Sequence, residues 1–574
     1  MSTLISVLGG VGLFLLGMSV MTTGLKAMAG SGLRATLSKA AATPLSGAFW
    51  GAFVTLIVQS SSATTMTTIG LVSAGLLTFS QGLGLVFGAN VGTTGTGWLI
   101  ALIGVRVSLT AYALPMIFVG ALIKVLGRGR VSAAGGALAG FALVLFGLTT
   151  LQQGMSGVAE QLHPSNLPAV SGAGVSVWSS VFGVFALIVV GLAMTAVMQS
   201  STAAIAVTLS AHFAGAVAID QACALIIGQN IGTATSSAMA ALGASSTAKR
   251  LALAYILFKL IAAVIALAFF PVTIPLLFRA SKTIDGVTLL AAYHTAYNVV
   301  GVAVLLPLVD WFTRIVERLL PERGSPLTRS LDKAALVTPL AAEEAVRRTV
   351  ARSLGAMCGS IADALMPASQ GPSARVSREA ISTTDVSGAL RQAREFISET
   401  SGPPESEAEQ ERLTSTLHAL DHASRIAEVA GETEDFASVP GGSEYERAAR
   451  LCAEAMRHAV AIADEVGALP DTPAQAARAL EGTQAVTAQG APTKQALVQL
   501  EYCASALREL QGAHRKVTLG SVASGSVSAD EAITRVDRVR RFDALAHHAW
   551  RSAAHLAGSG TAAANTTQPS PAQS

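Results

Sequence analysis

Charge is nearly absent from the first 310 residues of this chain. That stretch contains 12 Lys or Arg and 4 Asp or Glu, whereas residues 311–574 contain 27 and 32. A segment this long and this poor in charge suits the hydrocarbon core of a bilayer better than water. We therefore expect a polytopic membrane protein up to residue 320, followed by a region of ordinary soluble composition.

Apolar stretches long enough to cross a bilayer as helix, roughly 20 residues, occur at six places: 4–22, 108–126, 134–151, 177–198, 251–270 and 287–309. The first lacks a basic n-region and a small-residue cleavage site, so we expect a membrane helix and not a signal peptide. Two further apolar regions, 44–104 and 199–248, are interrupted by polar residues and glycine. Broken backbone at membrane depth is tolerated only where it is buried in protein or lines a polar cavity, so we look for function at these interruptions.

The two interrupted regions match each other at an offset of 140 residues. Gln-Ser-Ser-Ser-Ala at 59–63 matches Gln-Ser-Ser-Thr-Ala at 199–203, and Gly-Ala-Asn-Val-Gly-Thr at 88–93 matches Gly-Gln-Asn-Ile-Gly-Thr at 228–233. Over 59–94 against 199–234, 13 of 36 positions are identical without a gap. The preceding helices match at an offset of 130 through shared glycines: Gly10, Gly17 and Gly24 against Gly140, Gly147 and Gly154. Equal spacing of two polar motifs favours duplication over a chance likeness between Gly- and Ala-rich segments.

Basic residues cluster after the first span, at 124–130, at 249–250 and at 314–323, while the loop 152–176 has none. The positive-inside bias places these clusters in the cytoplasm. The two copies then enter the membrane from opposite sides, as in transporters whose sites lie near the midplane between inverted repeats. We expect an all-α fold with two inverted transmembrane repeats containing broken or re-entrant helices, a cytoplasmic helical-bundle domain and a disordered tail; the boundaries are 1–130, 131–320, 321–556 and 557–574.

Uncharged polar residues make up the repeated motifs. A hydroxyl can donate to an anion or ligate a cation, and a broken helix offers free N–H groups to anions and carbonyls to cations. The alternatives are back-bonding to the preceding turn for the hydroxyls and close helix packing for the asparagines. The duplication favours a site for a tetrahedral oxyanion and sodium ions. Its candidate residues are Gln59, Ser60, Ser61, Ser62, Thr64, Asn90, Thr93, Gln199, Ser200, Ser201, Thr202, Asn230 and Thr233.

The paired motifs resemble the signature of the type II sodium/phosphate cotransporter family, strongly over about 1–320 and weakly over about 330–556, where bacterial members often carry a PhoU-type helical domain. The resemblance implies Na⁺-coupled transport of inorganic phosphate across the cell membrane, with the two Gln-Ser-Ser elements forming the substrate and sodium sites and no organic cofactor. Two other classes stay open. One is a phosphate-sensing membrane protein that does not translocate; the other is a transporter of another oxyanion or a small neutral solute.

One position departs from the family pattern. His294-Thr-Ala-Tyr-Asn298 keeps the aromatic-Asn pair of a late helix, whereas the similar segment that starts at Tyr255 ends in Lys259 where Asn is expected. Lys259, His294 and Asn298 are therefore candidate modulators. Lys259 lies about 14 Å into its span, where an unpaired ammonium is costly. Either it snorkels toward the basic end of its helix, or its ammonium substitutes for a bound cation or attracts the anion.

The C-terminal region shows amphipathic helices at 339–367, 374–400, 404–430, 443–467, 472–483, 491–515 and 527–556. We expect antiparallel bundles that self-associate or bind a regulatory partner. Leu420-Asp421-His422 and the group Asp543, His547 and His548 vaguely resemble the acidic metal-binding motifs of PhoU-type domains; a solvated helix face is the alternative. No P-loop, nucleophile elbow or HExxH motif, and no basic stretch interleaved with aromatics, points to an enzyme or to a nucleic-acid partner.

Overall fold

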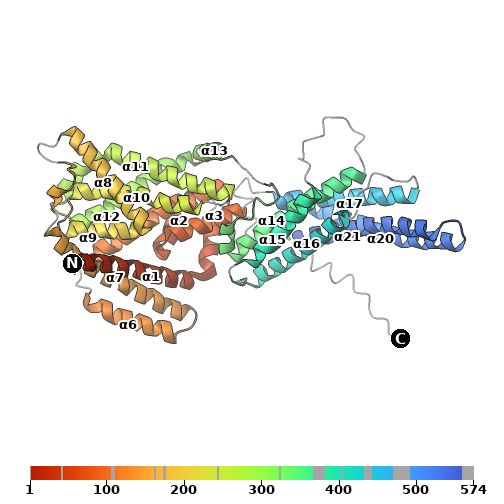
Figure 1. Cartoon of the computed structure of the whole chain (residues 1–574), viewed down its shortest axis with the longest axis horizontal. Helices are drawn as coiled ribbons and strands as arrows, with labels where there is room; N and C mark the ends of the chain where they lie inside the picture. Colours follow the sequence, from red (N-terminus) through yellow and green to blue (C-terminus); the bar gives the residue numbers. More distant parts are fainter. Residues whose placement is uncertain are drawn as a thin grey trace. The chain divides into compact units, whose positions relative to one another are not determined.

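In the computed structural model, every regular element of the described residues is a helix, as the sequence patterns predict (Figure 1). The chain divides into two units. The membrane unit comprises Met1–Ile69 and Leu77–Glu322, and the C-terminal unit comprises Gly70–Leu76 and Arg323–Ser574. The structure describes residues 2–40, 43–104, 110–160, 163–171, 176–241, 245–321, 325–365, 382–400, 402–404, 406–431, 443–468 and 491–558.

Two long helices of the membrane unit, α1 (Ser2–Ala40) and α7 (Arg130–Ala159), pack along rows of glycine. A Cβ atom added to any of three glycines in α1 would lie 2.5 Å from a backbone nitrogen in α7; the pairs are Gly10 with Leu151, Gly17 with Val144 and Gly24 with Ala137. The α7 partner number falls as the α1 number rises, so the helices are antiparallel. Adding 130 to the first row gives the glycines of the second, which meet α1 equally closely; the pairs are Gly140 with Met21, Gly147 with Phe14 and Gly154 with Val7.

In the first copy of the repeat, α2 (Pro44–Val58) and α3 (Ser61–Ser73) form a helical hairpin that turns at Gln59 and Ser60. The Oγ1 atoms of Thr55 and Thr64 lie 2.9 Å apart, whereas nine residues of continuous helix would span about 13.5 Å. The next elements are α4 (Phe79–Thr93), α5 (Gly95–Leu99) and the π-helical η1 (Ile100–Gly104). Helix α4 runs parallel to α2, because successive glycines of α4 contact carbonyls that advance along α2 in step.

The second copy repeats these boundaries. Helix α8 (Val177–Met198) ends, and α9 (Ser201–Phe213) and α10 (Ile219–Ala240) begin, exactly 140 residues after their counterparts α2, α3 and α4. The packing repeats as well. A Cβ on Gly88 would lie 1.9 Å from the Ala48 carbonyl oxygen, and one on Gly228 would lie 1.9 Å from that of Ile188. Helix α8 starts seven residues earlier than the offset from α2 predicts, so it is long enough to cross a bilayer whereas α2 is not.

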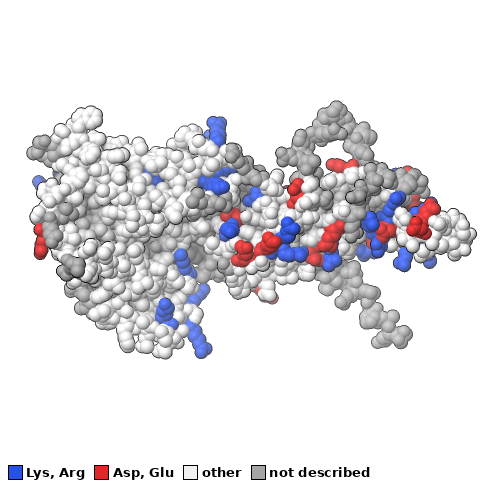
Figure 2. Space-filling model, in the orientation of Figure 1, with Lys and Arg blue, Asp and Glu red and all other residues white. Residues whose placement is uncertain are grey.

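The remaining elements of the membrane unit are α6 (Thr110–Leu126), η2 (Pro164–Asn166), α11 (Ser246–Ala280), α12 (Gly286–Leu305), η3 (Leu306–Leu308) and α13 (Val309–Leu319). Six described segments are long and apolar enough to cross a membrane: Thr3–Met28, Phe79–Leu102, Arg130–Ala159, Val177–Met198, Ser246–Ala280 and Gly286–Leu319. Five contain a predicted span. The sixth predicted span, 108–126, corresponds to the shorter apolar helix Tyr112–Leu126, and Phe79–Leu102 instead lies within one of the interrupted regions. The face of the membrane unit in Figure 2 is largely uncharged.

The C-terminal unit contains η4 (Lys333–Val337), α14 (Pro339–Leu365), α15 (Thr383–Ser398), α16 (Glu407–Gly431), α17 (Ser443–Gly467), α20 (Ala491–Ala523) and α21 (Ala529–Leu556). Six of the seven predicted helices are confirmed, and α20 runs eight residues beyond its predicted end. The predicted helix 472–483 and residues 559–574 of the predicted disordered tail lie outside the described residues. The PhoU likeness of this unit stays a prediction.

A buried carboxylate links α14 to α16 within the C-terminal unit. The side chain of Glu344 is fully buried and accepts from Arg347 at 2.8 Å, Arg348 at 2.7 Å and Arg412 at 2.9 Å. Burial opposes the ionisation of Glu344, but the three guanidinium groups outweigh it and lower the pKa of this carboxyl to about 2. The carboxylate is therefore charged at neutral pH, because its three arginine partners offset the cost of burying the charge.

Candidate substrate and ion site

The two glutamines of the repeated motifs adopt a backbone conformation that side chains rarely take. Gln59 has φ 55° and Gln199 has φ 51°, and among the described residues they are the only non-glycine residues with positive φ. Each caps the end of a helix in the left-handed region. For a residue other than glycine this conformation costs on the order of 1–3 kcal/mol and persists only where surrounding contacts impose it. The helix breaks predicted at these motifs are therefore present in both copies.

Both glutamine side chains make the same two hydrogen bonds. Gln59 donates from Nε2 to the Leu56 carbonyl and accepts at Oε1 from Thr96 Oγ1 at 2.5 Å. Gln199 donates to the Ala196 carbonyl at 2.5 Å and accepts from Ser236 Oγ at 2.8 Å. These bonds hold the left-handed turn and tie it to the segment after the repeated asparagine.

Sequence reasoning missed Thr96 and Ser236, although a signal for them exists. Each is a hydroxyl residue 37 positions after its glutamine. The pair lies two positions beyond the matched stretch, which ends at residues 94 and 234.

The serines after each glutamine open a new helix. Ser60 Oγ accepts from Ala63 N at 3.3 Å and Ser200 Oγ accepts from Ala203 N at 3.2 Å, which are N-cap bonds. Neither α3 nor α9 has an acidic residue in its first turn, so no carboxylate neutralises the positive end of either helix dipole. Four hydroxyls of these first turns make no hydrogen bond to any described residue: those of Ser61, Ser62, Ser201 and Thr202. They are free to contact a ligand.

Three hydroxyls of the predicted site are committed to the protein. Thr93 Oγ1 donates to the Ala89 carbonyl at 2.8 Å, and Thr233 Oγ1 donates to the Asn230 carbonyl at 2.6 Å. Back-bonding, the alternative considered from sequence, therefore describes these two threonines. Thr64 is buried and pairs with Thr55 across the hairpin.

The asparagine of the second copy belongs to a buried polar chain. Asn230 Oδ1 accepts a bond from Lys259 Nζ on α11, and Asn230 Nδ2 donates to Asn298 Oδ1 on α12 at 3.1 Å. Asn298 Nδ2 in turn donates to the His294 carbonyl at 2.8 Å. Lys259 is only 2% exposed, so it does not snorkel. The structure thus brings Lys259 and Asn298 to one asparagine of the repeated motif, whereas His294 contributes only a backbone carbonyl to Asn298 of its own helix. Asn90 bonds only to its own helix, at the Val86 carbonyl.

Besides the packing of α1 against α7, α5 also joins the two copies. This short helix packs against α9 and α12, and Trp98 Nε1 donates to Thr295 Oγ1 of α12 at 2.9 Å. No hydrogen bond within the described residues joins the two Gln-Ser runs directly. Because α5 follows Asn90 and packs against α9, the segment after Asn90 in the first copy lies beside the helix that begins at Ser201 in the second.

Comparison with known proteins agrees with these motifs. Residues 13–153 and 179–289 match the family described as Na⁺/Pi-cotransporter. Over these residues the membrane part of this chain is similar to the Na⁺/Pi-cotransporter family. The two matched segments hold both Gln-Ser runs, both asparagines and Lys259.

Proteins similar to this chain differ in how much of it they share. The uncharacterized protein YqeW of Bacillus subtilis is 29% identical over 320 residues, which is 54% of this chain and 96% of YqeW. YjbB of Escherichia coli K12, whose name proposes inorganic phosphate export, is 31% identical over 359 residues, 61% of this chain and 63% of YjbB. The sodium-dependent phosphate transport protein 2A of Oryctolagus cuniculus is 41% identical over 61 residues, 11% of this chain and 10% of that protein. The chain thus covers less than two thirds of YjbB. No solved structure matches this chain significantly.

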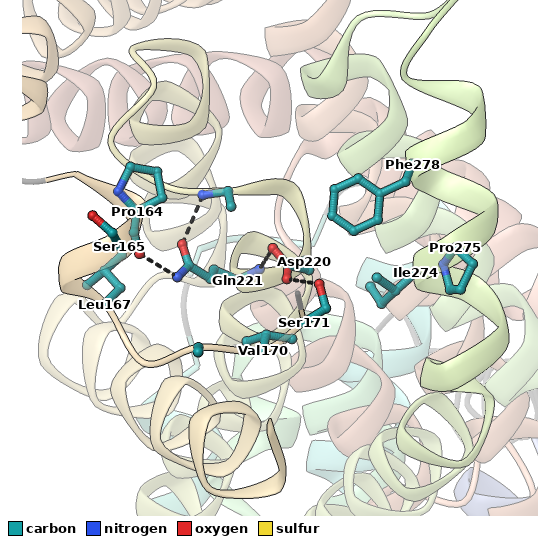
Figure 3. Close-up of a pocket in the computed structure, with 12 residues that line it drawn as sticks. Pro164, Ser165, Leu167, Val170, Ser171, Asp220, Gln221, Ile274, Pro275 and Phe278 are labelled. Carbon is teal, nitrogen blue, oxygen red and sulfur yellow. Dashed lines mark hydrogen bonds between the residues drawn. The ribbon is translucent and has the colours of Figure 1, made fainter. Parts of the chain in front are cut away.

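A cavity of about 590 Å³ lies elsewhere in the membrane unit, between η2, the start of α10 and the end of α11 (Figure 3). Asp220 accepts there from Ser171 Oγ at 2.5 Å, and Gln221 donates to the Pro164 carbonyl at 2.8 Å. Phe278 and Pro275 line the other wall. An ionised Asp220 would repel phosphate, and none of the candidate residues lines this cavity, so we do not assign the substrate to it.

The predicted motifs of the C-terminal unit meet in a histidine cluster between α16 and α21. His422 Nδ1 lies 2.9 Å from His548 Nδ1, and the rings of His547 and His555 lie 6.4 Å and 6.0 Å from that of His422. Burial, followed by the positive charge of neighbouring groups, lowers the pKa of His422, His547 and His555 to about 4. Asp421 pairs instead with Arg425 at 3.1 Å on an exposed face. The described residues contain no group of three or more ligands arranged to hold a metal.

Proposed function

We propose that this chain is a secondary active transporter that moves inorganic phosphate across the membrane coupled to sodium ions. The observation that carries the proposal is the matched pair of helix breaks at Gln59 and Gln199. Each break opens a helix N-terminus with unbonded hydroxyls and no carboxylate. The match to the Na⁺/Pi-cotransporter family supports both the substrate and the coupling ion.

The chemistry of the two breaks suits a tetrahedral oxyanion. Backbone N–H groups at a helix N-terminus donate to phosphate oxygens, and the helix dipole favours negative charge there. The hydroxyls of Ser61 and Ser201 add donors without adding formal charge. Hydroxyl and amide oxygens, such as that of Asn90, are suitable ligands for Na⁺ when the anion is close enough to offset its charge.

The two copies would work as inverted repeats. The antiparallel packing of α1 against α7 supports this arrangement, because equivalent helices of the two copies then cross the bilayer in opposite directions. Rocking of one repeat against the other around a fixed midplane site would expose phosphate to each side in turn. The positive-inside bias of the basic clusters supports a C-terminal unit in the cytoplasm of a cell-membrane protein, where it would self-associate or bind a regulatory partner.

Flux of labelled phosphate into proteoliposomes tests the proposal, with Na⁺ replaced by choline in parallel. Loss of one hydrogen bond to a charged ligand is worth about 1.5–3 kcal/mol, so Ser61→Ala and Ser201→Ala should each lower Na⁺-dependent flux at low phosphate about 10- to 100-fold. Ser156→Ala is the control, because its hydroxyl is exposed and bonds only to the Gln152 carbonyl. Wild-type flux in both site variants would remove the assigned site.

Binding assays separate the other two classes. Phosphate binding without flux would favour a membrane sensor. Stronger competition by sulfate than by unlabelled phosphate would favour a transporter of another oxyanion.

A further inference from the structure

Lys259 is the one described lysine buried within the membrane unit's helices, and the described residues offer its charge no counter-ion. Its side chain is 2% exposed, its ammonium bonds to Asn230 Oδ1, and it stands 5.4 Å from the centre of the Tyr255 ring. No carboxylate of the described residues forms an ion pair with it. An unpaired ammonium buried among membrane helices is costly by itself. Such an ammonium is retained most easily where its charge stabilises a bound anion.

The equivalent asparagine of the first copy has no such partner. Asn90 is 2% exposed, its Nδ2 donates to the Val86 carbonyl, and its Oδ1 accepts no hydrogen bond from any described residue. Two amide oxygens at equivalent positions of the repeat thus differ in one respect. A fixed monovalent cation holds one of them, and the other is open.

An ammonium group and a sodium ion can play the same electrostatic part at an amide oxygen. Each is a compact unit positive charge that binds oxygen lone pairs, and each offsets the charge of a nearby oxyanion. They differ in one consequence for transport. Sodium leaves with the substrate, whereas the lysine stays with the protein.

We propose that the Lys259 ammonium takes the place of a coupling cation in the second repeat, and that Na⁺ binds at Asn90 in the first. This inference rests on the proposed function, since it assigns the source of one positive charge in the loaded transporter. The protein then carries fewer sodium ions per phosphate than two symmetric asparagine sites would require. Replacing Lys259 by an amide restores an open site in the second repeat, which an additional sodium ion fills.

The test compares wild type, Lys259→Asn and Lys259→Arg in proteoliposomes, with ²²Na⁺ and ³²P-phosphate fluxes measured in parallel. Lys259→Asn should raise the Na⁺-to-phosphate ratio by about one ion and steepen the dependence of flux on Na⁺, because one charge must be replaced to balance the same anion. Lys259→Arg keeps the charge and should keep the wild-type ratio. Lys249→Asn is the matched control, because Lys249 lies on the same helix but is exposed.

A second measurement does not depend on transport. Thermal stability of the purified full chain in detergent is compared in NaCl and in choline chloride, each with phosphate present. Na⁺ should raise the midpoint more for Lys259→Asn than for wild type, because the variant has a further site for it.

Three outcomes decide the matter. An unchanged ion ratio and an unchanged Na⁺-induced shift in Lys259→Asn overturn the inference. A variant that changes only the apparent affinity for phosphate also overturns it, because the lysine would then attract the anion without replacing a cation. Absence of phosphate flux in wild type instead refutes the proposed function, and the Na⁺-induced thermal shift would still test whether Lys259 occupies a cation site.

Discussion

Two glycine-to-alanine changes in α1 should alter stability in opposite directions although they lie five residues apart. A Cβ on Gly12 meets nothing within 4 Å, so Gly12→Ala gains helix propensity of about 1 kcal/mol. A Cβ on Gly17 would lie 2.5 Å from Val144 N and 2.9 Å from Gly140 O. Both are backbone atoms, so no side-chain rotation relieves the overlap.

The helices α1 and α7 must move apart to accept Gly17→Ala. Overpacking of this kind costs about 1–3 kcal/mol, and a backbone contact belongs at the upper end of that range. Against a propensity gain of about 1 kcal/mol, we expect a net loss of about 2 kcal/mol. The difference from Gly12→Ala is then about 3 kcal/mol.

Retention of monodisperse protein after heating in detergent measures this difference. Gly147→Ala is the symmetric test, because its Cβ would lie 2.5 Å from Phe14 N; it should be as damaging as Gly17→Ala. If both variants survive heating as well as Gly12→Ala, the α1–α7 register described above is wrong.

Three further changes test other parts of the chain. Glu344→Gln removes the carboxylate that pairs with Arg347 and Arg348, while Arg412 keeps Glu343 at 2.7 Å. It should lower the stability of the C-terminal unit by about 3–5 kcal/mol in denaturant unfolding; an unchanged midpoint would contradict the ion network. The histidine cluster is neutral when folded, with a pKa of about 4 for His422 against the ordinary 6.5. The unfolded chain therefore binds more protons between these two values, and stability should fall as pH drops from about 6.5 to about 4. A thermal midpoint that does not change over that window would contradict this, and Glu344 does not titrate there because its pKa is about 2. Trp98→Phe removes the bond to Thr295 and should lower thermal stability by about 1 kcal/mol; stability equal to wild type would show that this contact between the copies contributes nothing.

Much of the fold follows from the order of residues along the chain. Hydropathy and length predicted five of the six spans, and helical periodicity predicted six helices of the C-terminal unit, because both patterns are local. For the sixth, 108–126, the described part is the shorter apolar helix that ends at Leu126, and residues 105–109 lie outside the described residues. The repeat predicted both helix breaks at the Gln-Ser motifs, because the Gln-Ser motif and the Gly-x-Asn motif recur at the same offset of 140 residues and so fix one alignment of the copies.

The sequence indicated which residues to consider for the candidate site, but not which of them contact one another. Nothing local to Asn230 or Lys259 says that they meet, since 29 residues and a helix boundary separate them. The same limit applies to Gln59 and Thr96, whose contact depends on how the hairpin folds back.

What the sequence determined by itself is therefore the set of periodic or duplicated features: a charge-poor membrane half, a charged helical half and two copies of one polar motif. The tertiary structure decided which of the two repeated asparagines contacts a lysine. It placed an ammonium on the asparagine of the second copy and left that of the first open, and it turned two glycine rows into one antiparallel interface. The physical reason is that such contacts arise from helix crossings between distant segments, which side-chain patterns along one segment do not encode.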